Sequence, residues 1–305
     1  MLTQLAAGVS FLDLEFQATP RIIATAVLRG AAGVALIDPG PSSSLPTLWR
    51  ELGTAGVSSD DVTALLLTHI HLDHAGGVGT LVRQNPRIRV YVHERGAAHL
   101  SNPEKLVASV ARLYGDAMDR LWGDVLPVPS SAIVPLTGGE RLEEGGRTLD
   151  VAYTPGHASH HVSYFSADTG IAFVGDTAGI KRGPHEYVLP PTPPPDIDVE
   201  LWRDSLARLA AWRPDTLFLT HFGPHGPSDP HLTEMNEHLD YVVNIAKAAL
   251  AREESDEARE EFFVAAIRRE LCRGMDEKEA RAYDLAARFD LSWRGIARYL
   301  RKRGS

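Results

Sequence analysis

Cysteine is almost absent from this chain, since Cys272 is the single one among 305 residues. An internal disulfide framework and a thiolate metal cluster within one chain are therefore excluded. Long apolar runs are also missing, because no stretch of eighteen apolar residues occurs. The first residues, Met1 to Leu5, carry no basic side chain ahead of their apolar ones. We therefore expect a cytoplasmic protein without a membrane partner.

Basic residues are fewer than acidic residues in this chain. The sequence has 31 Lys and Arg against 40 Asp and Glu, a formal charge of -9, and the basic run from Arg298 to Arg303 is local. Nucleic acid is thus a disfavoured partner, and a small-molecule substrate is the better expectation. The hydrophobic content of 44% and the charged content of 23% are typical of a globular chain that can bury a substantial core.

Short runs rich in Val, Ile and Leu alternate with helical patterns along most of the chain. We predict strands at 21–28, 33–38, 63–68, 87–92, 147–153, 161–166, 170–175 and 214–220. Helices are predicted after Ser44, after Pro103 and around Trp202. From about residue 230 no strand pattern remains, and three or four helices are expected. The prediction is therefore a catalytic domain over 1–229 and a helical region over 230–305, whose apolar stripes either pack on that domain or form a homodimer surface.

The stretch Thr68 to Gly77 reads THIHLDHAGG and follows the apolar run at 63–67. Alternate side chains of an extended segment share a face, so His69 and His71 point toward the same place, and Asp73 and His74 follow as the chain turns. A single histidine here would most simply be a solvated polar residue. Folding alone does not require this whole cluster, so a metal site is the better interpretation. Imidazole and carboxylate ligands without thiolate suit zinc, iron or manganese.

Other predicted strands end in the same chemistry. The run at 147–153 leads to His157, the run at 170–175 leads to Asp176, and the run at 214–220 leads to His221. Together with the first cluster these residues make seven ligands, which exceeds what one tetrahedral ion uses. The number is about right for two ions that share one carboxylate.

This set of residues resembles the metallo-β-lactamase superfamily of binuclear metallohydrolases, as in glyoxalase II-like thioesterases and N-acyl homoserine lactonases. The resemblance covers roughly residues 20 to 225 and includes the H-x-H-x-D-H motif, a later P-G-H, a G-D after an apolar strand and a final strand-end histidine. It implies an α+β protein with a four-layer αββα sandwich. It also implies that two divalent ions, zinc or alternatively iron or manganese, are bound. His69, His71 and His157 would hold the first, Asp73, His74 and His221 the second, and Asp176 would bridge both.

Three departures refine the resemblance. Cys272 lies far from any matching motif, which argues against the β-lactamases that use a cysteine ligand, and His71 stands where flavodiiron proteins have glutamate. His160 stands where glyoxalase II-like proteins usually have glycine. His161 then falls behind the ligands, where it either supports them or makes a plain structural hydrogen bond.

Substrate contacts are harder to predict. Tyr187 follows Asp176 near the place where the lactonases have a tyrosine that contacts the substrate carbonyl, although ordinary packing is the alternative. The proline-rich loop 189–195 is either a rigid connection or a wall of the substrate pocket.

The resemblance implies hydrolysis of an ester, thioester or lactone by a metal-bridging hydroxide, with Asp73 as the catalytic residue that orients it and accepts its proton. A single-iron persulfide dioxygenase is an alternative on the same fold. A phosphodiesterase or ribonuclease is a further alternative, against which the acidic charge argues.

Overall fold

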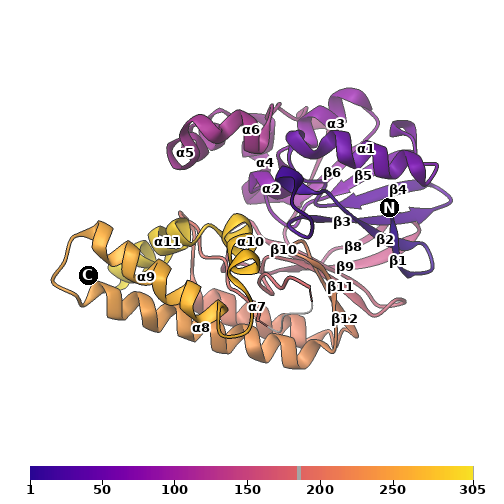
Figure 1. Cartoon of the computed structure of the whole chain (residues 1–305). Helices are drawn as coiled ribbons and strands as arrows, with labels where there is room; N and C mark the ends of the chain where they lie inside the picture. Colours follow the sequence, from indigo (N-terminus) through magenta and orange to yellow (C-terminus); the bar gives the residue numbers. More distant parts are fainter. Residues whose placement is uncertain (184–186, 305) are drawn as a thin grey trace.

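Two β-sheets lie face to face in the computed structural model of the chain, which describes residues 1–183 and 187–304. The first sheet has seven strands in the order β1-β2-β3-β4-β5-β6-β7, and the second has six in the order β13-β12-β11-β10-β9-β8 (Figure 1). The strands of the first sheet are β1 (Thr3–Ala6), β2 (Val9–Asp13), β3 (Ala24–Gly30), β4 (Gly33–Ile37), β5 (Val62–Leu66), β6 (Arg89–His93) and β7 (Ile133–Leu136). Those of the second are β8 (Arg141–Glu144), β9 (Arg147–Tyr153), β10 (Val162–Ser166), β11 (Ile171–Gly175), β12 (Thr216–Leu219) and β13 (Gly223–His225).

Helices cover the outer face of each sheet. The helices are α1 (Leu45–Thr54), α2 (Leu72–Ala75), α3 (Val78–Gln84), α4 (Glu94–Ser101), α5 (Glu104–Tyr114), α6 (Met118–Trp122), α7 (Val199–Ala211), α8 (Ser228–Leu250), α9 (Asp256–Leu271), α10 (Glu277–Ala287) and α11 (Phe289–Arg303). Helices α1 and α3 lie over the first sheet, and α7 and α8 lie under the second (Figure 1). The chain is thus an α+β protein with the four layers of an αββα sandwich, extended by C-terminal helices.

The alternation of side chains along the strands explains the layers. In β5, Ala64 and Leu66 are buried between the two sheets, whereas Leu65 packs on the other side with Leu48 of α1. Both faces of such a strand are apolar because both are covered. The hydroxyl of Tyr164 in β10 donates to the carbonyl of Leu67, 2.8 Å away, and so ties the second sheet to the end of β5.

The C-terminal helices share one core with the second sheet. Trp202 of α7, Phe263 of α9 and Trp293 of α11 are fully buried in the same cluster as Val174 and Leu217. The predicted boundary between 1–229 and 230–305 falls just inside α8, and the division into two domains stays a prediction. No helix in the described part of the chain is long and apolar enough to cross a membrane.

Parallel strand pairs bring the functional residues to one edge. Strands β4, β5 and β6 run parallel in the first sheet, and β11 and β12 run parallel in the second. The carboxyl ends of parallel neighbours meet at one edge of a sheet. His69 follows β5, Asp176 follows β11, and His221 follows β12.

Candidate metal centre

Three imidazoles form the first group of the centre. The Nε2 atom of His69 lies 2.9 Å from Nδ1 of His71, and Nε2 of His157 lies 3.0 Å from the same Nδ1 atom. Ligand nitrogens around a tetrahedral ion with bonds of 2.0–2.1 Å are ~3.3 Å apart. The three nitrogens therefore converge on a space close to the size of one ion.

Asp73, His74 and His221 form the second group. Nε2 of His221 lies 3.4 Å from Oδ2 of Asp73, and Nε2 of His74 lies 3.9 Å from that oxygen. His74 and His221 are buried, whereas the Asp73 side chain keeps 20% of its surface exposed. The carboxylate is thus the member of the group that solvent or a substrate reaches.

Asp176 lies between the two groups. Its Oδ2 atom is 3.3 Å from Nε2 of His157, whereas its Oδ1 atom is 3.3 Å from Nε2 of His74 and 3.6 Å from Nε2 of His221. One oxygen therefore faces each group, which is the arrangement of a bridging ligand. The structure brings together all seven residues that the sequence singled out.

The outward nitrogen of each of three imidazoles donates to a fixed acceptor. Nδ1 of His74 lies 2.8 Å from Oδ2 of Asp38, Nδ1 of His157 lies 3.0 Å from the carbonyl of Pro191, and Nδ1 of His221 lies 2.6 Å from the carbonyl of Ile22. A neutral imidazole that donates through Nδ1 presents an unprotonated Nε2. These contacts orient the rings and leave the inward nitrogens free to coordinate.

Asp38 is a functional residue that the sequence analysis missed. Its fully buried carboxylate accepts hydrogen bonds from the hydroxyls of Thr68 and Thr220, both at 2.7 Å, as well as from His74. Each threonine precedes a ligand, so one carboxylate aligns the ends of β4, β5 and β12. A signal was available, since Asp38 ends an apolar run and is followed by Pro39 and Gly40, as Asp176 ends another.

Burial and charge act differently on the imidazoles. Burial lowers the pKa of His71 to about 3 and holds that of His69 well below its ordinary value, so both rings are neutral. Burial also opposes protonation of His74, but the Asp176 and Asp38 carboxylates outweigh it and raise its pKa. A proton on His74 therefore offsets the negative charge of these buried carboxylates when no metal is bound.

The cluster fits divalent cations. Nε2 of His74 and Oδ1 of Asp176 are buried and face each other at 3.3 Å, and neither forms a hydrogen bond with another residue in the described ranges. Buried polar atoms without partners cost free energy, and coordination would satisfy both. Nitrogen and carboxylate donors suit zinc, iron or manganese.

His161 lies directly behind the ligands. Its Nε2 atom accepts from the backbone N–H of Asp176 at 3.2 Å, and its ring stacks on that of His69 with centroids 5.0 Å apart. The hydroxyls of Thr154 and Thr177 lie 3.0 and 3.1 Å from its Nδ1 atom. These contacts support a role for His161 in holding Asp176 and His69 in place.

Tyr187 is not brought to the centre. Its ring stacks on His238 with centroids 4.0 Å apart, and its carbonyl accepts from the hydroxyl of Tyr283. The tyrosine that does reach the cluster is Tyr114 at the end of α5, which lines both cavities described next. Tyr187 does not line either of these cavities, and its role as a substrate contact stays a prediction.

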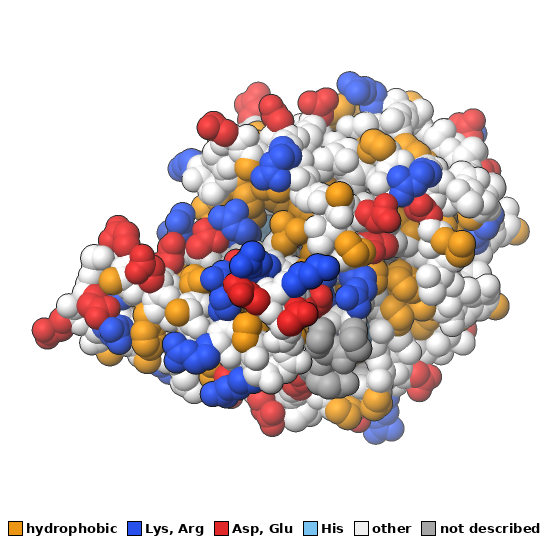
Figure 2. Space-filling view, viewed as in Figure 1, with side chains coloured by type: hydrophobic (Ala, Val, Ile, Leu, Met, Phe, Trp, Pro, Cys, Tyr) orange, Lys and Arg blue, Asp and Glu red, His pale blue; other side chains and the backbone are white. Residues whose placement is uncertain are grey.

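Two cavities meet at Asp73. One, of about 80 Å³, also reaches His71, His157 and Asp176, and the other, of about 140 Å³, reaches His221. Both are lined by Tyr114, Trp122 and Ala286, so α5, α6 and α10 all border the centre. The space-filling view shows the surface hollowed between the part that carries α5 and the part that carries α9 and α11 (Figure 2).

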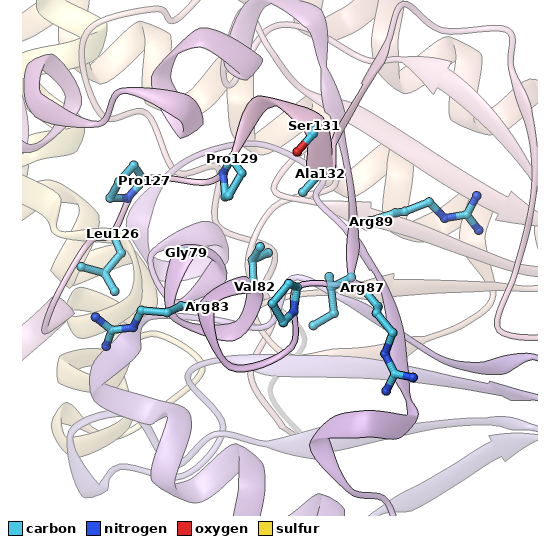
Figure 3. Close-up of a pocket in the computed structure, with 12 residues that line it drawn as sticks. Gly79, Val82, Arg83, Arg87, Arg89, Leu126, Pro127, Pro129, Ser131 and Ala132 are labelled. Atoms are coloured by element: carbon cyan, nitrogen blue, oxygen red, sulfur yellow. The ribbon is translucent and has the colours of Figure 1, made fainter.

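A cavity of about 600 Å³ opens at a different place, between the end of α3 and the loop at 126–132 (Figure 3). None of the seven clustered residues lines it. The side chains of Arg83, Arg87 and Arg89 leave its rim in different directions (Figure 3), and two of them pair with Asp60 and Glu144. The three guanidinium groups therefore do not converge on one anion.

Comparison with known proteins agrees with this geometry. The family model of the metallo-beta-lactamase superfamily matches residues 18–221. The metallo-beta-lactamase fold-containing protein ST1585 of Sulfurisphaera tokodaii is 28% identical over 239 residues, which are 77% of this chain and 86% of that protein.

A hydroxyacylglutathione hydrolase of Aeromonas salmonicida is 32% identical over 182 residues, which are 60% of this chain. The matched part spans only 54% of that enzyme's own length. Among solved structures, the metallo-beta-lactamase family protein TTHA1429 of Thermus thermophilus superposes with a TM-score of 0.71 at 23% identity. That superposition covers 99% of this chain and 95% of the other, and at this identity it shows the fold alone.

Proposed function

Because the chain belongs to the metallo-beta-lactamase superfamily, we propose that it hydrolyses an ester, thioester or lactone with two divalent metal ions, zinc being the first expectation. The observation that carries this proposal is the position of Asp176, whose two oxygens each face a separate group of three ligands. Hydroxyacylglutathione hydrolases match this chain over about half of their own length, and this similarity supports a thioester as one candidate substrate.

The residues would divide the work as follows. His69, His71 and His157 would hold one ion, Asp73, His74 and His221 the other, and Asp176 would bridge them. Ions held there would polarise a carbonyl oxygen and lower the pKa of a water molecule toward neutrality.

Asp73 would orient the attacking water molecule. Burial alone would raise its pKa, but His74 and His221 outweigh burial and lower it to about 2. A carboxyl group with so low a pKa stays ionised at neutral pH and can accept a hydrogen bond from the attacking water. It would hold the proton of that water only briefly. Because Asp73 lines both cavities, its carboxylate lies where an acyl carbon and its leaving group would meet.

The experiment compares the purified protein with Asp176→Ala in metal content and in turnover of aryl esters, thioesters and lactones. We expect the variant to lose metal and to lose activity with every substrate, because both groups lose a shared ligand. Asp60→Ala, which removes an exposed carboxylate, serves as the matched control and should change neither quantity. An Asp176→Ala protein that turns over substrate at the wild-type rate without metal would contradict the proposal.

The alternative of a single-iron persulfide dioxygenase is tested by the same metal analysis. Such an enzyme would keep most of these ligands but would contain one iron per chain, whereas the hydrolase would contain two ions. The second group, with a buried imidazole pair and a carboxylate at 3.4–3.9 Å, supports a second ion and therefore hydrolysis.

A further inference from the structure

The smaller cavity at the centre has an apolar wall that the seven ligands do not supply. Val110 and Leu113 of α5 line one side, Pro191 and Pro193 line another, and Leu291 of α11 lines a third. Apart from the clustered residues, the polar groups of the described lining are the hydroxyl of Tyr114 and the indole N–H of Trp122. Among the residues that the structure describes, no Lys, Arg or further carboxylate lines this cavity to bind a charged group, so an apolar substituent is the occupant that fits.

The cavity is also small. Its volume of about 80 Å³ is well below the ~300–1,000 Å³ of pockets that hold drug-sized ligands. The neighbouring cavity, of about 140 Å³, meets it at Asp73 and contains Arg120 and Arg288. The leaving group of a substrate can therefore lie on that side, while the apolar cavity receives the acyl side.

The proline wall is fixed in place. The carbonyl of Pro191 accepts from the ligand His157, and the hydroxyl of Thr192 donates to the carbonyl of Ser292 at 3.0 Å. The loop approaches α11 so closely that a Cβ atom on Gly295 would lie 2.1 Å from the carbonyl oxygen of Thr192. Movement of this wall to admit a larger group would disturb both a metal ligand and a helix contact.

The opposite wall is braced by aromatic contacts. Tyr114 meets Trp122 edge to face with centroids 5.1 Å apart, the guanidinium of Arg288 lies 5.3 Å from the centre of its ring, and Trp122 stacks on Phe16 at 5.7 Å. Burial raises the pKa of Tyr114, so its hydroxyl stays protonated and can donate to a substrate oxygen. The cavity is thus preorganised on two sides.

We propose that this cavity admits only a short apolar acyl group, so that the substrates are esters, thioesters or lactones of short apolar carboxylic acids. The inference rests on the proposed hydrolysis and adds the acyl selectivity. It assigns Val110 and Leu291 as the residues that limit acyl length, since both are branched aliphatic side chains that line the cavity, one from α5 and one from α11.

The test measures kcat/KM for p-nitrophenyl acetate, butyrate and octanoate, which share one leaving group. For the wild type we expect a rise of about fourfold per methylene from acetyl to butyryl, the gain from burying each one. Octanoate should fall about fivefold or more below butyrate, because overpacking costs about 1 kcal/mol or more.

Two cavity variants and one control sharpen the result. Leu291→Ala should raise the octanoate-to-butyrate ratio about tenfold, and Val110→Phe, on the half-buried wall, should lower the butyrate-to-acetate ratio by a similar factor. Ile296→Ala removes an equally buried aliphatic side chain from α11 outside the cavity and should leave both ratios unchanged. If Leu291→Ala fails to fold, Val110→Phe still decides the question.

A binding measurement separates this inference from the proposed function. Calorimetric titration of the metal-loaded protein with butyrate and octanoate varies chain length at a constant carboxylate. Tighter binding of butyrate supports the cavity assignment. Equal or tighter binding of octanoate, or a kcat/KM that keeps rising to octanoate, overturns it. Absence of hydrolysis with every acyl group would instead overturn the proposed function and leave the titration to decide the cavity.

Discussion

At the scale of single residues, the buried carboxylate of Asp38 supports the candidate metal centre, because it accepts from His74 and from two threonine hydroxyls. His69, His71, Asp73 and His74 are close in sequence, so their pattern is visible in one stretch of chain. Asp38 acts through contacts with Thr68 and Thr220, which lie 30 and 182 positions away. The sequence shows that Asp38 ends an apolar run, as Asp176 does, but it does not show which distant residues this carboxylate contacts.

Replacement of Asp38 by Asn should weaken metal binding by about 10–100-fold, the range found for partners that orient ligands. The amide keeps the size of the side chain but loses the charge that holds Nδ1 of His74 and two hydroxyl donors. Metal affinity is measured by competition with a chromophoric chelator, and Asp60→Asn is the matched exposed control. Unchanged affinity in Asp38→Asn would mean that the buried carboxylate does not orient the ligand.

His231 should make the protein less stable as the pH falls from neutrality. Its burial lowers its pKa to about 4, and its Nε2 atom donates to the carbonyl of Ala178 at 2.8 Å. In the unfolded chain, His231 becomes protonated as the pH falls below its ordinary pKa of about 6.5. In the folded chain, it becomes protonated only near pH 4. The free energy of unfolding therefore keeps its full value with respect to His231 above pH 6.5. It falls toward pH 4, by roughly 3 kcal/mol at most.

Urea unfolding of the metal-loaded protein at several pH values between 7 and 5 measures this effect. The variant His231→Gln keeps a donor for Ala178 but does not titrate, so its free energy of unfolding should fall less steeply over the same range. Identical slopes for the two proteins would show that the burial of His231 does not contribute to the acid sensitivity.

At the scale of elements, long apolar strands were predictable and short or polar ones were not. The eight predicted runs correspond to β3, β4, β5, β6, β9, β10, β11 and β12. Among the strands that were not predicted, β8 reads RLEE and β7 contains Pro135, whereas β2, which reads VSFLD, is apolar and was missed. Strands β7 and β8 form because pairing with a neighbouring strand outweighs a poor intrinsic preference.

The loop that carries His157 depends on a glycine at its contact with α7. Gly156 has a φ of 137°, and a Cβ atom there would lie 2.3 Å from Cα of Trp202. The indole of Trp202 in turn packs edge-on against His157 with ring centroids 5.6 Å apart. A side chain at position 156 must therefore push α7 away from His157, a candidate metal ligand.

Gly156→Ala should lower the free energy of unfolding by about 1–3 kcal/mol, as overpacking does, and should reduce bound metal. Chemical denaturation and metal analysis check the two effects. Gly53→Ala is the matched control, because Gly53 lies in helix α1 with nothing within 4 Å of an added Cβ atom, so alanine there should be neutral or stabilising. Equal stability of the two variants would contradict this account of the contact.

At the scale of the whole molecule, the centre is a junction of both sheets and the C-terminal helices. The strand ends of each sheet supply ligands, whereas the cavity is closed by α5, the proline loop, α10 and α11. The loop 189–195 is thus both a rigid connection and a wall, the two interpretations that the sequence left open. Val110 and Leu291 line one cavity although they are far apart in the sequence, and no local pattern indicates this, so the cavity could not be predicted. Two domains, a homodimer and the absence of a nucleic-acid partner stay predictions.

The most direct test of the binuclear hydrolase is a metal titration. Protein stripped of metal is loaded with increasing zinc, and the rate of butyrate ester hydrolysis is followed against the measured number of ions per chain. We predict that activity reaches its plateau only as the second ion binds, because both groups of ligands and Asp176 are complete only then. A plateau at one ion per chain, or a rate that does not depend on metal, would contradict the account.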